Sequence, residues 1–84
     1  MAPDKRQPRA DGERARSRIL HALADYHRTE HRPPTFAELG TQLGVVRSTI
    51  AHHLRTLERQ GLVRIEPGSR GVFLTDAGSA AARR

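Results

Sequence analysis

Apolar residues recur at helical spacing along the first third of the chain. Ile19, Leu20 and Leu23 form one stripe, and arginines occupy the opposite side of the same segment. His27 lies where this stripe requires an apolar side chain, so we expect its ring to be partly buried. The pattern predicts a first helix over residues 13–30.

Two consecutive prolines end this helix, and a second, short helix is predicted after them. Thr35 and Glu38 have the spacing of a capping box, in which the side chain of each accepts a hydrogen bond from the backbone amide of the other. Leu39 and Leu43 continue an apolar face. Gly44 suits the left-handed residue that closes a short helix and turns the chain sharply.

A third helix is predicted over residues 47–60, with Ile50, Leu54 and Leu57 on one face and Gly61 as its end. Its opposite face contains no acidic side chain and is therefore basic. That face holds Ser48, His52, Arg55 and Arg59, flanked by Thr49, Ala51 and Thr56.

Two segments typical of short strands follow, residues 62–66 and 71–75, and a Pro-Gly-Ser-Arg turn joins them. They predict a two-stranded hairpin with a basic tip. The order of helix, helix, tight turn, helix and hairpin predicts a mainly α fold with a small β-hairpin. This is the winged helix-turn-helix, a three-helix bundle with a two-stranded wing.

The chain is short enough for one domain with two short ends. Residues 1–12 contain prolines and almost no apolar side chains, so we expect a disordered basic arm there. Residues 13–76 form the winged-helix domain. Residues 77–84 are expected to be a short helix or a frayed tail, because Gly78 and Ser79 weaken an alanine-rich helix.

The formal net charge of +6 comes almost entirely from arginine and is concentrated at both ends of the chain. Polyanions are the natural partners of such a protein. Cysteine is absent, which excludes disulfides, thiolate metal ligands and cysteine nucleophiles. No segment suits a bilayer span or a signal peptide, so we expect a cytoplasmic, nucleoid-associated protein without a membrane partner.

A basic helix face that follows a short capped helix and a glycine turn is typical of a recognition helix in the major groove of double-stranded DNA. The candidates for base contacts, near the amino end of the helix, are Arg47, Ser48, Thr49 and His52. The candidates for phosphate contacts, further along, are Arg55, Thr56 and Arg59.

Further contacts are expected outside the third helix. Ser69 and Arg70 at the hairpin tip would reach the adjacent minor groove or backbone, because arginine suits a narrow, electronegative groove. The free amides near Thr35, at the start of the second helix, would bind a phosphate. Simpler alternatives are a solvated turn at the tip and amides already used by the capping box.

Particular residues resemble those of a known family. Residues 33–35, 37–38 and 43–44 read PPT, AE and LG, which resembles the signature of the amino-terminal DNA-binding domain of the LexA repressor family. Residues 47–71 resemble the recognition helix and wing of that family, and equally those of MarR-type repressors. The similarity spans residues 16–75 and implies a sequence-specific DNA-binding transcriptional regulator that acts as a repressor.

Three differences limit what the resemblance implies. The turn before the third helix is one residue shorter than in the family, so the family's base-reading positions and operator do not transfer. No part of the 84 residues resembles the peptidase domain that follows in the family, so we expect no self-cleavage. Val46 stands where such helices often carry a capping serine, and losing that cap costs on the order of 1 kcal/mol.

The sequence contains few features that support other functions. A zinc site at His27 and His31 would have only two ligands, and no metal, cofactor or small-molecule ligand is expected. No nucleophile elbow, carboxylate pair or phosphate loop predicts an enzyme. The alternative is a winged-helix protein-interaction module in a larger complex, whose third helix would expose apolar anchors. A homodimer on a palindromic site is expected, because one such domain buries too little surface for high specificity.

Overall fold

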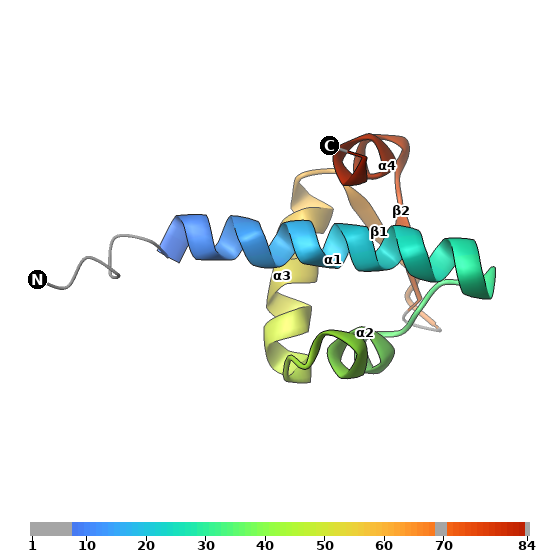
Figure 1. The fold of residues 1–84 in the computed structure, drawn as a ribbon, viewed down its shortest axis with the longest axis horizontal. Coiled ribbons are helices and arrows are strands. Elements are labelled where there is room, and N and C mark those ends of the chain that lie inside the picture. Colours follow the sequence, from blue (N-terminus) through green and yellow to red (C-terminus); the bar gives the residue numbers. More distant parts are fainter. Residues whose placement is uncertain (1–7, 69–70, 84) are drawn as a thin grey trace, which may run out of the picture.

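The computed structural model describes residues 8–68 and 71–83 of the chain (Figure 1). These residues are mainly helical with a two-stranded antiparallel hairpin, which confirms the predicted fold class. The elements are α1 (Pro8–Glu30), α2 (Phe36–Leu43), α3 (Arg47–Arg59), β1 (Val63–Ile65), β2 (Val72–Leu74) and α4 (Asp76–Ala82). Within the described ranges, no helix combines the length and the apolar composition that a bilayer crossing requires.

Helix α1 lies across α3 and packs against every other helix and against β2 (Figure 1). Apolar side chains from all of these elements meet in one small cluster, so α3 is held with one face inward. The buried members of this core are Ile19, Leu20, Ala22, Leu23, Leu39, Ile50, Leu54, Leu57, Val63, Val72 and Ala82.

Two expectations about α1 are wrong. The helix begins at Pro8 rather than at residue 13, because proline is favoured at the first helical position, where an amide hydrogen would have no partner. The expected arm is therefore helical from residue 8, and residues 1–7 lie outside the described ranges. His27 is exposed rather than partly buried, because the carboxyl end of α1 extends past the core (Figure 1).

Close backbone contacts fix the turn between α2 and α3. Gly44 has a φ of 68°, the left-handed conformation predicted for it. The amide of Val45 donates a hydrogen bond of 2.9 Å to the carbonyl of Gly40. A Cβ atom on Gly40 would lie 2.8 Å from the carbonyl oxygen of Val45, so this turn requires glycine at position 40. The turn thereby sets the direction in which α3 starts.

Strands β1 and β2 form the hairpin, with Val63 opposite Leu74 and Ile65 opposite Val72. The amide of Val72 also donates a hydrogen bond of 3.0 Å to the carbonyl of Pro34, in the loop before α2. The end of the paired strands that lies next to the turn is therefore attached to the segment that starts the helix-turn-helix. This contact links two segments that lie far apart in the sequence.

The segment after the wing is helical, one of the two states expected for it, and α4 extends to Ala82. Thr75 caps this helix, since its side-chain oxygen accepts a hydrogen bond of 3.0 Å from the amide of Gly78. The same hydroxyl donates a hydrogen bond of 2.7 Å to the carbonyl of Gly61, at the end of α3. Thr75 therefore connects the carboxyl end of α3 to the start of α4.

Candidate nucleic-acid interface

One side of α3 faces solvent, and it is the side that the sequence predicts. Ile50, Leu54 and Leu57 are buried on the opposite side. The residues predicted to contact DNA from this helix all reach the surface, and we call them together the outer face of α3. Thr56 is partly exposed, and the exposed members are Arg47, Ser48, Thr49, His52, Arg55 and Arg59.

Hydrogen bonds organise the carboxyl half of the outer face. The hydroxyl of Thr56 donates to the carbonyl of His52 over 3.3 Å and accepts from Arg59 Nη2 over 3.2 Å. Arg59 is thereby held along the helix surface. The Thr56 hydroxyl already has a donor and an acceptor partner, so it is less free for phosphate than the neighbouring arginines.

Among the described residues, no carboxylate forms an ion pair with a cationic group of the outer face. The first turn of α3 contains no acidic residue. In the described part of the chain, the ion pairs join Asp25 to Arg28, Arg32 to Glu38, and Arg64 to Glu66, and none of them involves α3. The guanidinium groups of α3 therefore remain available to anions that approach from solvent.

A groove separates the outer face from the wing, and its chemistry is mixed. Arg47 and Arg55 line it on one side. Glu58 of α3 and Glu66 of the hairpin line it as well, which places two carboxylates beside the basic face. The sequence places Glu58 to one side of the third helix. It does not indicate that Glu66 lies near this helix, because Glu66 reaches the groove only when the hairpin folds back against α3.

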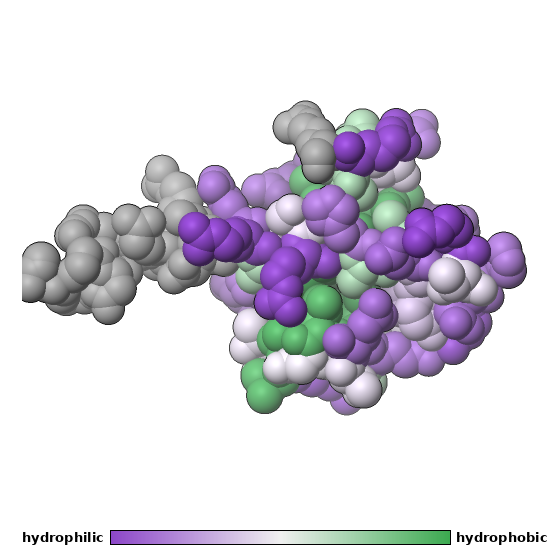
Figure 2. All heavy atoms as spheres, viewed as in Figure 1, coloured by the Kyte–Doolittle hydropathy of each residue, from purple (hydrophilic) through white to green (hydrophobic). Residues whose placement is uncertain are grey.

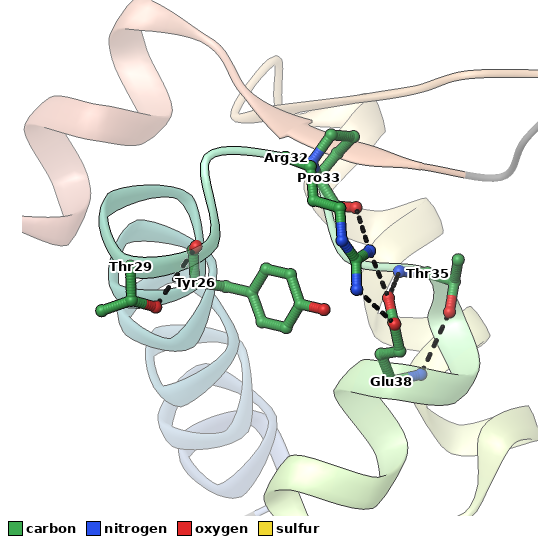
Figure 3. A network of polar contacts seen from close by, with 6 residues as sticks. All are labelled: Tyr26, Thr29, Arg32, Pro33, Thr35 and Glu38. Carbon is green, nitrogen blue, oxygen red and sulfur yellow. Dashed lines mark hydrogen bonds and ion pairs between the residues drawn. The ribbon is translucent and has the colours of Figure 1, made fainter.

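A network of polar contacts occupies the start of α2 (Figure 3). Thr35 and Glu38 form the predicted capping box, with hydrogen bonds of 2.9 Å and 3.2 Å. Arg32 adds a bidentate contact to Glu38, at 3.1 Å and 2.9 Å, and its guanidinium lies 5.3 Å from the centre of the Tyr26 ring. The sequence analysis missed Arg32, although it is the first basic residue before Glu38.

These contacts govern the charge at the start of α2. Hydrogen bonds from Arg32 and from the backbone amide of Thr35 lower the pKa of Glu38 to about 2. The bond to Glu38 in turn raises the pKa of Arg32 above its ordinary value. Thr35 therefore has both its hydroxyl and its amide occupied, and a phosphate at this helix end would meet the ionised carboxylate of Glu38.

Of the predicted wing residues, Ser69 and Arg70 lie outside the described ranges. The hairpin presents another arginine that the sequence analysis did not single out. Arg64 is exposed, and its guanidinium lies 4.6 Å from the centre of the Phe73 ring on the paired strand. It also lies 3.7 Å from the carboxylate of Glu66. Strand alternation alone would place Arg64 on the solvent side.

His53 lies on the flank of α3 that faces α1. Its Nδ1 atom is buried, and no hydrogen-bond partner for it occurs among the described side chains and backbone. Burial lowers the pKa of His53, and the nearby His52 and Arg16 lower it further. His52 and His53 pack edge to face, with ring centres 5.4 Å apart. Each of these effects favours the neutral form of His53, which lies beside a cationic surface.

In the described ranges, no group of three or more histidine, cysteine, aspartate or glutamate side chains is arranged to hold a metal ion.

A surface pocket lies on the far side of the core, between α1, β2 and α4, and it is lined by His21, His27 and Arg28. That pocket is remote from the outer face of α3.

The family model of the LexA DNA binding domain matches residues 13–71. Among solved structures, an IclR transcriptional regulator from Alicyclobacillus acidocaldarius is 33% identical with a TM-score of 0.68, over 80% of this chain and 26% of that one. A MarR family regulator from Neisseria meningitidis is 28% identical with a TM-score of 0.59, over 76% of this chain and 48% of that one.

The transcriptional regulator MosR from M. tuberculosis, solved in complex with DNA, is 28% identical with a TM-score of 0.63, over 99% of this chain and 73% of that one. This chain thus spans about a quarter of the IclR regulator and about half of the MarR regulator. No curated protein matches the sequence.

Proposed function

The chain belongs to the LexA DNA-binding domain family, and we propose that it is a sequence-specific, double-stranded DNA-binding transcription regulator that represses transcription. In this proposal α3 docks in a major groove, and the wing lies at the adjacent minor groove or backbone. The bound domain blocks transcription by occupying a short operator. The MosR regulator with DNA has a similar fold, which supports DNA as the partner.

The observation that carries the proposal is the excess of cationic groups on the outer face of α3. Arg55 and Arg59 project from a helix that is fixed to the core on its other side, and neither has a carboxylate partner among the described residues. A major groove is bordered by two phosphate backbones and exposes a row of base edges between them. A rigid helix with arginines and short polar side chains fits both of these features.

The roles within the outer face follow from position along the helix. Arg47, Ser48, Thr49 and His52 belong to the amino-terminal half, which enters a groove most deeply in helix-turn-helix proteins, so we assign them to base edges. Arg55 and Arg59 are assigned to phosphates. Thr56 is assigned a smaller share of the phosphate contact, because Arg59 and the His52 carbonyl already engage its hydroxyl.

The start of α2 and the wing complete the proposed interface. The phosphate contact near Thr35 is assigned a smaller share, because the capping box and the bidentate pair between Arg32 and Glu38 already engage the polar groups at this helix end. Ser69 and Arg70 keep their assignment to the wing contact. Two copies of the domain on a palindromic site would supply the specificity that one copy lacks.

A protein-interaction module is the competing function. Such a surface buries aromatic or aliphatic anchors at its centre. The outer face of α3 offers arginine, histidine and hydroxyl groups instead, which favours nucleic acid.

The test is binding of the whole chain to random-sequence duplex DNA, measured by fluorescence anisotropy between about 50 and 200 mM salt. We expect log affinity to fall linearly with log salt concentration. The double variant Arg55→Ala/Arg59→Ala should bind more weakly and show a slope reduced by about 1.8, because each phosphate contact contributes about 0.9.

The matched control is Arg28→Ala/Arg83→Ala, which removes the same charge from the pocket between α1, β2 and α4. It should retain most of the affinity and the slope. Equal losses in both double variants would mean that only the net charge matters. No binding at low salt would favour the protein-interaction module.

A further inference from the structure

Among the described residues, Val46 is the large hydrophobic side chain that is exposed, with 67% of its surface accessible. The other large aliphatic side chains in these ranges belong to the core or pack against it, and the partly exposed Phe73 lies against Arg64. Figure 2 shows hydrophobic surface at the lower left of the molecule, over the turn between α2 and α3. An apolar side chain is therefore displayed where α3 begins.

Valine at position 46 stabilises the start of α3 less than a capping residue would. It is the N-cap of α3, and its side chain makes no capping hydrogen bond. Its carbonyl accepts hydrogen bonds from Thr49 and Ile50, but valine cannot satisfy the first amides of the helix as serine or threonine would. Because a capping residue would stabilise α3, the folded state alone does not explain valine at this position.

The surroundings of Val46 define what it can contact. It lines a shallow depression with Ala37 and Thr41 of α2 and with Arg47 of α3. The walls are thus methyl and hydroxyl groups beside a single cation. A surface of that kind complements an apolar group that lies a few ångströms from a negatively charged backbone.

We infer that Val46 contacts the C5 methyl group of a thymine in the major groove and thereby selects an A·T pair at one operator position. The inference rests on the proposed function, since it assumes that α3 enters the groove with its amino end foremost. Thymine is the base that carries a methyl group on its major-groove edge. Arg47, the next residue, lies beside this contact and is placed to reach the neighbouring base pair or phosphate.

The experiment begins with selection of bound duplexes from a random DNA pool by the whole chain. In a selected duplex each thymine is then replaced singly by uracil, which removes only the C5 methyl group. For the wild type, one such replacement should weaken binding about fourfold, the factor expected for one buried methyl group. For Val46→Ser, the same replacement should have no effect.

Two controls separate this contact from folding and from a general loss of methyl groups. Val46→Ser should unfold at the same temperature as the wild type or at a higher one, because serine is a good N-cap. Thr41→Ser removes a methyl group from the same depression and should keep the sensitivity to uracil.

The outcomes distinguish the two proposals. If the selection enriches no duplex, the proposed function itself fails, and Val46 is better regarded as an anchor for a protein partner. If duplexes are bound but wild type and Val46→Ser respond equally to every uracil, DNA binding stands and the thymine contact is overturned. A fourfold effect that disappears only in the Val46 variant supports the inference.

Discussion

A Cβ atom on Gly78 would collide with the carbonyl oxygen of Leu62. The first turn of α4 therefore packs directly against the backbone that connects α3 to β1. Thr75 supports the same approach, since its amide donates a hydrogen bond of 3.1 Å to the Leu62 carbonyl. The contact seals the end of the core that lies opposite the α2–α3 turn.

The first prediction concerns this contact. Gly78→Ala should destabilise the protein by about 1–3 kcal/mol, because the added methyl group meets a backbone oxygen that cannot move aside. The gain of about 1 kcal/mol in helix propensity from glycine to alanine does not offset that clash. Thermal unfolding followed by circular dichroism measures the change.

Gly68→Ala is the matched control, because a Cβ atom there would have nothing within 4 Å. It should leave the unfolding temperature almost unchanged. A Gly78→Ala variant as stable as the wild type would show that α4 is not packed against Leu62 in solution.

The second prediction concerns Thr35. Thr35→Ala removes the hydroxyl that accepts a hydrogen bond of 3.2 Å from the Glu38 amide. The loss should be about 1 kcal/mol, typical of an N-cap, and should lower the unfolding temperature by about 4–8 °C. Thr35→Ser keeps the hydroxyl and should restore most of the stability. If the serine variant is as unstable as the alanine variant, packing of the threonine methyl is responsible instead.

The third prediction follows from the lowered pKa of Glu38, about 2 in the fold against an ordinary value of 4.5. A carboxyl group with a lowered pKa stabilises the fold fully above its unfolded pKa, and this contribution is lost as the pH falls. Stability should therefore decrease between pH 4.5 and about pH 2.

Glu38→Gln keeps an oxygen for the Thr35 amide but loses the charge paired with Arg32. Its unfolding temperature should vary less across this acid range than that of the wild type. Glu58→Gln, at an exposed carboxylate without an ion pair in the described ranges, is the control. A parallel pH profile for Glu38→Gln and wild type would contradict the role of the pair.

The fourth prediction concerns His53, whose pKa lies below its ordinary value of 6.5 in the folded protein. The unfolded chain then binds a proton more readily than the folded one, so stability should fall as the pH drops below 6.5. Well above that pH the histidine is neutral in both states, and the effect vanishes.

His53→Gln should flatten this part of the stability profile. His21→Gln serves as the control, because His21 is exposed on α1, where its ring is hydrogen-bonded to the Ser17 carbonyl. The measurement is chemical denaturation at a series of pH values between about 5 and 8, the range in which histidine titrates. An unchanged slope in the His53 variant would place the titrating group elsewhere.

The fifth prediction separates base contacts from phosphate contacts on α3. His52→Ala should change the preference for one base pair by about 1–3 kcal/mol while leaving binding to random DNA nearly unaffected. Arg59→Ala should weaken binding to all sequences alike and reduce the salt slope by about 0.9. Parallel selections with the two variants would reveal the difference. Identical consensus sequences for wild type and His52→Ala would contradict the assignment.

The sequence predicts the second and third helices and the capping box well, because these depend on local spacing, but it places the start of α1 too late. Apolar residues at positions 50, 54 and 57 define the inner face of α3 whatever surrounds it. The same local reasoning fails for His27, whose burial depends on whether other elements cover the end of α1. Local reasoning also predicts that Gly78 weakens the last helix, although the fold requires glycine at this position.

For the candidate site, the sequence predicts which side chains of α3 face solvent but not what lies beside them. Arg32 reaches Glu38 only because two prolines redirect the chain between them. Glu66 comes near α3 only through the pairing of β1 with β2 and the packing of the hairpin. Such contacts join segments that are far apart in the sequence or separated by a bend, and the spacing of apolar residues does not predict them. They are seen only in the folded structure.

The hydrogen bond from Val72 to the carbonyl of Pro34 has a mechanical consequence. It ties the second strand of the hairpin to the loop that precedes α2, although α2, α3 and β1 separate these two segments in the sequence. A displacement of the hairpin is therefore transmitted to the start of the helix-turn-helix, and the two segments move together.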